Sequence, residues 1–492
     1  MPRKVARGIK YTDATIPYQE DMKQRSGKWF KLIQFRNAAM PVARLIAIAA
    51  LLLSSSAQAQ SFKETFPRVA NFSNKYALDY GDPDFRQRLA KYDIAVLGMW
   101  RGYTRADHVT GEMLDVRDVV VDIKRRARLM GNDNILVGKY TSINETLSDP
   151  NGGAKQDRFD KITSETGPGY PRNNDWFARD KNGENLSSWP GTWLTNLTDF
   201  VQRDANGDTY PEWAARRDFN LFFRDTPELD IWFYDNWFYR PRRNADWDGD
   251  GVDDDRDDPA VRKYIREGYM RGLNRARQLA PDMIFLGNVD GQPVENVGML
   301  TEPEYRGQLT GLFEAAMGRD HSAETWGGWE TMMHQYRTLI QNSQYNVALL
   351  NVQGDPQDYA TMRYGLASCL MDNGYYMFSS LVKDYEAQIW FDEFDIDLGR
   401  AIDPPQAEAW QNGVYMRRFE FGMALANPKG NGRRTVQIPE GYQRFSGTQD
   451  PATNNGQPVD SVTLRERDGL ILVSTDADPL MRPKPPVLSL AD

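Results

Sequence analysis

The segment Ile231-Trp-Phe-Tyr-Asp235 decides how the sequence is interpreted, because four apolar or aromatic residues run without interruption into an acidic one. A short continuous apolar run is typical of a strand that is buried on both faces, as in a parallel sheet. Similar runs recur along the chain and alternate with longer amphipathic segments, which is the pattern of repeated βα units. We therefore expect an α/β fold in which this segment is one strand of a parallel sheet.

Eight such strands with helices between them predict a closed (β/α)8 TIM barrel. One helix is expected over 116–129, and another starts at Asp258-Pro259, an N-cap followed by proline at the first helical position, and ends before Pro281. The expected strands, in chain order, are Ile94–Trp100, Ile135–Tyr140, Trp176–Arg179, Ile231–Asp235, Ile284–Asn288, Leu309–Glu314, Val347–Asn351 and Gly374–Phe378.

The barrel is expected over 60–403, and the sequence pattern at the two ends of the chain differs from that of the barrel. After Pro404, short alternating segments separated by turns such as Asn427-Pro428 predict a small antiparallel β-sandwich over 404–492. Residues 1–59 are interpreted as an N-terminal extension and a signal peptide. Arg44 supplies the positive charge of that signal, 45–53 its apolar core, and 57–59 an Ala-x-Ala cleavage site.

The apolar core of this signal is much shorter than the roughly 20 residues that span a bilayer. We therefore expect a protein that is exported to the periplasm or the extracellular space, without stable membrane insertion. The 492 residues include 60 Lys and Arg against 69 Asp and Glu, a net charge of −9, and this charge argues against a nucleic-acid partner.

Cysteine and histidine chemistry is sparse in this sequence. Cys369 is the only cysteine, so an internal disulfide is impossible. The three histidines, His108, His321 and His334, lack the HExxH or CxxC spacing of zinc sites. We expect no organic cofactor, and His-dependent nucleophilic triads are disfavoured.

Carboxyl groups are the remaining candidates for catalysis. Reactive side chains of parallel barrels lie where strands end, at the C-terminal rim. Asp235 ends the fourth expected strand and Glu314 the sixth, so both could face one sugar. Glycosidic bond cleavage uses two carboxyl groups, and we assign Asp235 as the nucleophile and Glu314 as the acid/base. Either acid could instead cap a helix or pair with an arginine at the rim.

Aromatic and amide side chains crowd the same loops and are candidate sugar ligands. Flat rings stack on the apolar faces of pyranoses, while amides bind hydroxyl groups. The alternative for each ring is packing of a long loop against the barrel. The substrate-binding candidates are Trp100, Tyr140, Trp193, Asn236, Trp237, Asn288, Trp326 and Gln353, and Trp189, Tyr239 and Trp329 lie in the same group of aromatic residues.

The acidic run between Asp246 and Asp257 matches the spacing of a calcium-binding loop. Acids stand at positions 1, 3, 5, 9 and 12, and Gly251 stands at position 6, where such a loop turns sharply. Position 12 is Asp rather than Glu, and a solvated acidic run is the alternative. We expect a structural Ca²⁺ in an insertion over 244–258. Its candidate ligands are Asp246, Asp248, Asp250, Val252, Asp254 and Asp257.

The segment Ile231–Trp237 resembles the fourth-strand nucleophile segment of the α-galactosidase-like superfamily of TIM barrels, where an aromatic-Asp-Asn triplet carries the nucleophile. The acid/base of that superfamily lies at the end of strand six. By their positions in the fold, the resemblance implies that Asp235 is the nucleophile and Glu314 the acid/base. The relatives usually have Asp, and not Glu, at the acid/base position. The span from about Tyr92 to Val473 looks like an uncharacterised, hypothetical glycoside hydrolase family related to endo-polygalactosaminidase-like barrels.

This resemblance implies a glycoside hydrolase that acts on a poly- or oligosaccharide, and retention of anomeric configuration is expected. Carboxyl groups about 5 to 5.5 Å apart indicate retention, and roughly 6.5 to 9.5 Å indicates inversion. Two alternatives stay open: a carbohydrate-binding barrel without catalysis, and a transglycosylase that passes the sugar to another hydroxyl.

Overall fold

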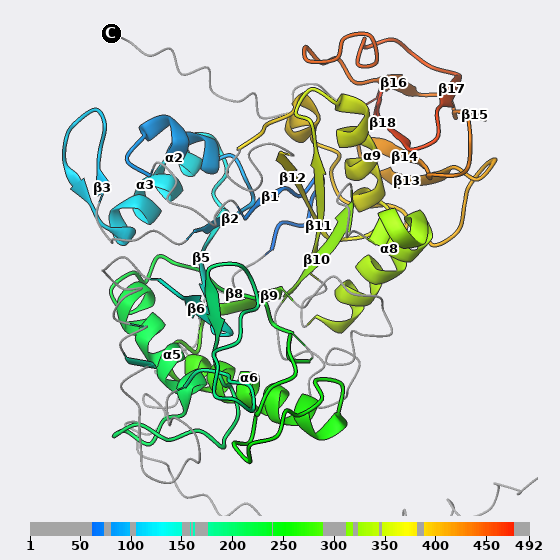
Figure 1. The fold of residues 1–492 in the computed structure, drawn as a ribbon. Coiled ribbons are helices and arrows are strands. Elements are labelled where there is room, and N and C mark those ends of the chain that lie inside the picture. The colour runs from blue at the N-terminus through cyan, green and yellow to red at the C-terminus, as the bar shows by residue number, and fades with distance from the viewer. Residues whose placement is uncertain are drawn as a thin grey trace, which may run out of the picture. The chain divides into compact units, whose positions relative to one another are not determined.

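Eight parallel strands form the central sheet of the computed structural model, and they follow one another in chain order (Figure 1). Val69, just before the first strand, pairs in parallel with Tyr376 of the last strand. The Tyr376 N–H donates to the Arg68 carbonyl at 2.8 Å, so the sheet closes on itself as a barrel. The strands are β1 (Ala70–Asn71), β2 (Ile94–Leu97), β5 (Leu136–Ser142), β8 (Ile231–Asp235), β9 (Ile284–Asn288), β10 (Gly311–Met317), β11 (Val347–Gly354) and β12 (Tyr375–Ser380).

The structure describes residues 62–72, 80–98, 105–149, 158, 161–162, 176–238, 240–288, 311–317, 323–343, 347–380 and 388–476, without the side chains of 105, 311–317 and 347. The expected signal peptide, the expected ring of Trp100 and the expected strand residues 309–310 lie outside these ranges.

The expected third strand at Trp176–Arg179 is wrong. Phe177 and Arg179 form only isolated antiparallel bridges, with Thr195 and Asn185, and neither belongs to the barrel. The barrel instead begins with β1, which the sequence analysis missed because two residues are too few to show a period. Before Ile231, the prediction contained one false strand, Trp176–Arg179, and lacked one true strand, β1. The count of strands is therefore unchanged, and β8 is still the fourth strand.

Alternate residues of the strands fill the barrel interior. Ile231 and Phe233 of β8 belong to the interior cluster, whereas Trp232 and Tyr234 pack between the sheet and the helices. Because successive side chains of a strand point to opposite faces, Asp235 continues the inward series at the C-terminal end of β8. The interior cluster consists of Ala70, Phe72, Ile94, Val96, Leu136, Ile231, Phe233, Ile284, Leu286, Leu349, Tyr375 and Met377.

The helices begin where the sequence supplies caps. At Val116–Leu129 the expected helix is confirmed, with a reciprocal capping box between Asp115 and Asp118. The helix Pro259–Leu279 is also confirmed, and Asp258 accepts from the Ala260 N–H at 2.7 Å. The described helices are α2 (Pro83–Leu89), α3 (Val116–Leu129), α5 (Tyr210–Asp218), the π-turn η1 (Phe219–Phe223), α6 (Pro259–Leu279), α8 (Ala323–Asn342), α9 (Tyr359–Leu370) and the 3₁₀ turn η3 (Asp392–Asp395). Among the described residues, none of the helices combines the length and the apolar character needed to cross a bilayer.

Helix α6 approaches its neighbours closely through its small residues. A Cβ added to Gly268 would lie 2.2 Å from the Leu197 carbonyl oxygen, so only glycine fits there. A Cβ added to Gly272 would lie 3.2 Å from the Pro211 carbonyl oxygen, a tight contact that is less severe than the one at Gly268. The small-residue face of this helix thus holds the segment around Leu197 against the barrel.

The C-terminal strands are antiparallel, as expected. Their two sheets share one buried apolar cluster, to which Val414, Leu425, Val436 and Leu464 contribute. The four-stranded sheet has the order β13 (Tyr415–Phe419), β14 (Gly422–Asn427), β18 (Asp468–Ser474) and β16 (Tyr442–Arg444), and the two-stranded sheet pairs β15 (Arg434–Gln437) with β17 (Ser461–Leu464). Gln60–Asp492 forms one compact unit by its contacts. The sandwich and the boundary at 404 stay predictions.

Two short antiparallel pairs complete the described strands. They pair β3 (Arg105–Ala106) with β4 (Met113–Leu114), and β6 (Glu145–Leu147) with β7 (Thr192–Leu194). The second pair matters for the site, because β6 follows barrel strand β5 after only two residues. It therefore places Glu145 close to the C-terminal end of that strand.

Candidate active site

Asp235 is held by hydrogen bonds from two neighbouring barrel strands. The Tyr140 hydroxyl of β5 donates to Asp235 Oδ2, and the Asn288 amide of β9 donates to Asp235 Oδ1 at 2.9 Å. Each of the three side chains continues the inward-facing series of its strand, two residues after the previous inward position. They therefore meet at the C-terminal end of the barrel interior. Asp235 is half-buried. Two of the predicted substrate-binding residues, Tyr140 and Asn288, thus contact the predicted nucleophile directly and orient both of its oxygens.

The chain turns sharply immediately after Asp235. Asn236 has φ 57°, in the left-handed region that asparagine tolerates better than most residues. Its carbonyl accepts from the Asn144 amide and, at 2.9 Å, from the Tyr269 hydroxyl. Asn144 Oδ1 lies 2.5 Å from the same Tyr269 hydroxyl, so the single hydrogen of that hydroxyl is shared between the two acceptors. This network fixes the backbone turn that ends β8, and with it the direction of the Asp235 side chain.

Glu145 is a second carboxyl group at this site, and it is not among the residues predicted from the sequence. Glu145 Oε1 accepts from the Asn236 side-chain amide at 2.7 Å, and Oε2 accepts from the Ser188 hydroxyl at 2.7 Å. Burial raises the pKa of Glu145; the Ser188 hydrogen bond opposes this, and the nearby charge of Asp235 adds to it. The guanidinium of Arg242 lowers that pKa, but the net direction is upward. A carboxyl group whose pKa is raised by burial and by a nearby acid suits the role of a general acid.

The signal that could have found Glu145 is its position. Asn144 and Glu145 follow the apolar run of β5, just as Asp235 and Asn236 follow that of β8. The rule that polar residues after barrel strands reach the C-terminal rim applies to both pairs. Glu145 escaped notice because it begins a short strand of its own and carries no spacing motif.

Glu314 lies on β10, the sixth barrel strand, as expected. Phe313 pairs with Leu349 and Ala315 with Leu350, so Glu314 is the extra residue of a β-bulge. Bulges often redirect a side chain near an active site. The side chain of Glu314 lies outside the described residues, so its role as acid/base stays a prediction.

The predicted aromatic ligands divide into buried and accessible rings. Trp237 is 2% exposed and packs 4.7 Å from the Tyr269 ring centroid, so it belongs to the core and offers no face to a sugar. Trp329 is equally buried and donates to Ser368 Oγ at 2.8 Å. Trp193 is half-buried.

Accessible rings remain at two places. Trp326 is 48% exposed and Trp189 is 43% exposed. The Arg242 guanidinium stacks on Trp189, 4.1 Å from its ring centroid.

Gln353, on β11, donates to the Ser380 carbonyl at 3.2 Å. Trp100 and Tyr239 lie outside the described residues.

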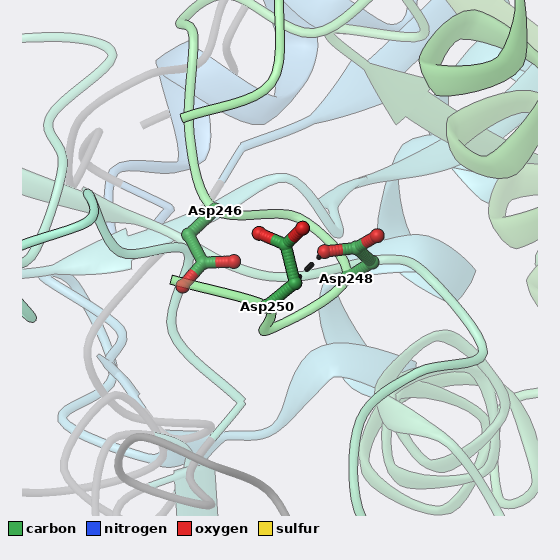
Figure 2. A group of neighbouring side chains, drawn as sticks. All are labelled: Asp246, Asp248 and Asp250. Carbon is green, nitrogen blue, oxygen red and sulfur yellow. Dashed lines mark hydrogen bonds between the residues drawn. The ribbon is translucent and has the colours of Figure 1, made fainter. Parts of the chain in front are cut away.

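The predicted calcium loop brings three of its acids together. One carboxylate oxygen each from Asp246, Asp248 and Asp250 lies within 4.8 Å of the other two (Figure 2). Turn hydrogen bonds shape the loop: Asp246 Oδ2 accepts from Gly251 N–H at 3.0 Å, and Asp248 Oδ1 accepts from Asp250 N–H at 3.1 Å. Asp257 is directed elsewhere, because it forms ion pairs with Arg240 and Arg262.

The remaining predicted ligands of that loop flank the three acids. Asp254 Oδ2 accepts from the Trp247 N–H at 2.9 Å. Val252 is exposed, and its N–H donates to Asp250 Oδ1 at 2.8 Å. Burial raises the pKa of Asp254, and the charges of Asp248, Asp250 and Asp246 add to this. The loop thus concentrates negative charge in a small volume.

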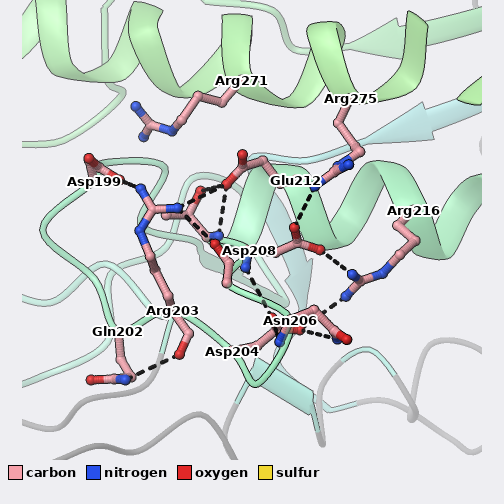
Figure 3. Close-up of polar contacts among 12 residues, drawn as sticks. Asp199, Gln202, Arg203, Asp204, Asn206, Asp208, Glu212, Arg216, Arg271 and Arg275 are labelled. Carbon is pink, nitrogen blue, oxygen red and sulfur yellow. Dashed lines mark hydrogen bonds and ion pairs between the residues drawn. The ribbon is translucent and has the colours of Figure 1, made fainter. Parts of the chain in front are cut away.

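A second acid-rich loop, 204–208, has the related sequence Asp-Ala-Asn-Gly-Asp. Arg216 of α5 lies 3.0 Å from Asp204 Oδ2 and 2.5 Å from Asp208 Oδ2 (Figure 3). Arg275 of α6 donates to Asp208 Oδ1 at 2.9 Å. Both aspartate side chains are 1% exposed. These ion pairs tie the two helices to the loop.

A closed parallel α/β barrel with a hydrogen-bonded carboxylate at the end of its fourth strand has the arrangement of a barrel hydrolase. The chain belongs to hypothetical glycosyl hydrolase family 15, whose sequence profile matches residues 143–423. This range includes Glu145, Asp235 and Glu314. The expected membership of a hypothetical glycoside hydrolase family is thereby confirmed.

Solved glycoside hydrolases resemble the chain at low identity. The glycoside hydrolase domain of PelA from Pseudomonas aeruginosa shares 14% identity, with a TM-score of 0.36, over 65% of this chain and 97% of that one. The GH36 α-galactosidase AgaA from Geobacillus stearothermophilus shares 10% identity, with a TM-score of 0.40, over 83% of this chain and 56% of that one. The galactosidase domain of the α-galactosidase-sucrose kinase AgaSK shares 12% identity, with a TM-score of 0.41, over 83% of this chain and 54% of that one. The chain spans about half the length of these α-galactosidases. None of the curated proteins matches it.

Proposed function

We propose that this chain is an exported glycoside hydrolase that cleaves a poly- or oligosaccharide with retention of anomeric configuration. The observation that carries the proposal is Asp235, at the end of the fourth barrel strand, with Tyr140 and Asn288 bound to its two oxygens. The membership of a glycosyl hydrolase family supports the reaction class. The signal peptide expected within 1–59 supports export.

Asp235 is the proposed nucleophile. Its carboxylate attacks the anomeric carbon, the bond to the leaving oxygen breaks, and an acid gives its proton to that oxygen. The same group then takes a proton from water, and the hydroxide oxygen replaces Asp235 at the anomeric carbon. The hydrogen bonds from Tyr140 and Asn288 hold Asp235 in one direction, which favours in-line attack.

Two residues are candidates for the acid/base. Glu314 has the expected position on the sixth strand, at the bulge of β10. The raised pKa of Glu145, caused by burial and by the charge of Asp235, suits an acid, and its hydrogen bond to Asn236 links it to the residue that follows the nucleophile. We retain Glu314 as the first assignment from sequence position, and Glu145 as its rival.

Hydrolysis by Asp235→Asn, Glu314→Gln and Glu145→Gln variants on a panel of polysaccharides tests the proposal. We expect Asp235→Asn to lower kcat by about 10⁴-fold or more, because no covalent intermediate can form. Loss of the acid/base should lower kcat/KM about 10²- to 10⁴-fold on substrates with poor leaving groups. On aryl glycosides with acidic leaving groups, which need no proton to depart, the kcat/KM of the acid/base variant should stay close to that of the unsubstituted chain.

The pH profile separates the two acid/base candidates. Only the variant that lacks the true acid loses the alkaline limb of kcat/KM, and only that variant regains turnover with azide, as a glycosyl azide of retained configuration. Full activity of Asp235→Asn would overturn the proposal. Sugar binding without turnover by the unsubstituted chain would indicate a binding barrel, and transfer to a sugar hydroxyl would indicate a transglycosylase.

A further inference from the structure

The loop after β8 gathers three acids for which the described part of the chain supplies no cationic side chain as a partner. Among the residues that the structure describes, no ion pair involves Asp246, Asp248 or Asp250, although one oxygen of each lies within 4.8 Å of the others (Figure 2). Three carboxylates at this separation repel one another unless a positive charge lies between them. The neighbouring Asp257 is different, since Arg240 and Arg262 already balance its charge.

Asp246 supplies independent evidence for a ligand. The residue is 5% exposed, and its Oδ1 atom is buried without a hydrogen-bond partner. Its other oxygen is used, because Oδ2 accepts from the Gly251 N–H at 3.0 Å. A buried carboxylate oxygen without a partner is strongly unfavourable, whereas a bound cation would satisfy it.

We propose that this loop binds one Ca²⁺ ion through Asp246, Asp248 and Asp250. The three donors are carboxylate oxygens, which suit a hard cation with variable coordination. Mg²⁺ demands near-ideal octahedral geometry and keeps most of its water. The Val252 carbonyl and Asp254 stand at positions 7 and 9 of the spacing and complete the ligand set.

The ion would act as a brace for the segment that follows Asp235. The Trp247 carbonyl, between two of the ligands, accepts from Asn196 Nδ2 at 3.1 Å and from Thr198 Oγ1 at 3.2 Å. The Asp246 N–H donates to the Arg179 carbonyl at 2.9 Å. The calcium loop therefore joins the segment 179–198 to the loop that carries Arg242 toward Glu145. This role is separate from hydrolysis, so its test needs no substrate.

Calcium titration of the full chain, stripped with EGTA, tests the site. Isothermal titration calorimetry should show one Ca²⁺ per chain, and Ca²⁺ should raise Tm. Tb³⁺ in place of Ca²⁺ should luminesce on excitation of tryptophan, because Trp247 lies within the loop. The double variant Asp248→Asn/Asp250→Asn should weaken Ca²⁺ binding at least about a hundredfold, since affinity follows the charge of the ligands.

The matched control is Asp255→Asn, an exposed acid of the same loop outside the triad. Asp255 Oδ1 accepts from the Asp257 N–H at 3.0 Å, a bond that asparagine keeps. This variant should bind Ca²⁺ as the unsubstituted chain does, and circular dichroism should show both variants folded. The proposal is overturned if the stripped chain binds no Ca²⁺, if the double variant binds as the control does, or if Mg²⁺ binds more tightly than Ca²⁺.

Discussion

Two loops of this molecule have nearly the same acidic spacing but balance their charge in different ways. In the loop 204–208, Asp204 and Asp208 are buried against Arg216 and Arg275 (Figure 3). In the loop 246–250, the three acids face one another without an arginine among the described residues (Figure 2). The same spacing therefore forms one loop that is internally neutralised and one that we propose needs a metal ion.

The difference teaches that acid spacing predicts a turn, and that residues distant in sequence decide whether the turn needs a cation. Asp204 Oδ1 accepts from its own loop, at 2.8 Å from Asn206 N, as the acids of the calcium loop do. Its counter-charge comes from Arg216, twelve residues away, and that of Asp208 from Arg275, 67 residues away. No local motif contains these partners.

The largest expected effect is on the internally neutralised loop. Asp208→Ala removes the buried acid that Arg216 and Arg275 share, so that Arg216 keeps only Asp204, and should lower the free energy of unfolding by about 3 kcal/mol. The loss should be the same in EGTA and in Ca²⁺. Urea denaturation measures it, with Asp225→Ala as a control, because Asp225 pairs with Arg224 on the surface and should matter little. Equal stability of the two variants would contradict a buried network.

How much of the fold the sequence predicts depends on the length of each element. The helix Val116–Leu129 was predicted at its observed bounds, because its amphipathic face begins directly after the Asp115 cap. The strand β8 was predicted because its apolar run is long. The strand β1 could not be found, since two residues carry no period and its pairing with β2 is set by the closure of the barrel.

The candidate site was predictable where it follows from the strand period. Asp235 and Asn288 end inward-facing series of their strands, so their contact could be anticipated. Glu145 could not be assigned in the same way, because its pKa depends on burial and on Asp235, which lies 90 residues further along the chain. Trp237 was expected to bind sugar, but the turn at Asn236 directs its ring into the core against Tyr269.

An intermediate effect is expected when a substitution puts a positively charged side chain into the calcium loop. Asp250→Lys places a positive charge beside Asp246 and Asp248, and should make stability independent of Ca²⁺. The unsubstituted chain should gain about 2.7 kcal/mol at Ca²⁺ concentrations a hundredfold above Kd, and the variant should gain none. In EGTA the variant should be at least as stable as the unsubstituted chain, because repulsion is relieved. Melting curves with and without Ca²⁺ measure this, and a full calcium response of the variant would contradict the comparison.

The smallest expected effect is a pH dependence of the neutralised loop. Burial alone would raise the pKa of Asp204, but the N–H groups of Asp208 and Asn206 and the charge of Arg216 outweigh it, so that this pKa is lowered. The pKa of Asp in the unfolded chain is about 3.9. An acid whose pKa is lower than this in the folded state stabilises the protein at pH values above about 3.9, and this stabilisation is lost as the pH falls through the pKa of the folded state.

Asp204→Asn should therefore flatten the acid side of the stability curve. Between pH 5 and pH 3, the unsubstituted chain should lose more free energy of unfolding than the variant, by about 1 kcal/mol or less. Urea denaturation of both proteins in EGTA at the two pH values measures the difference. Parallel curves would mean that the loop N–H groups and Arg216 do not lower the pKa of Asp204, and the contrast between the two loops would then rest on Asp208 alone.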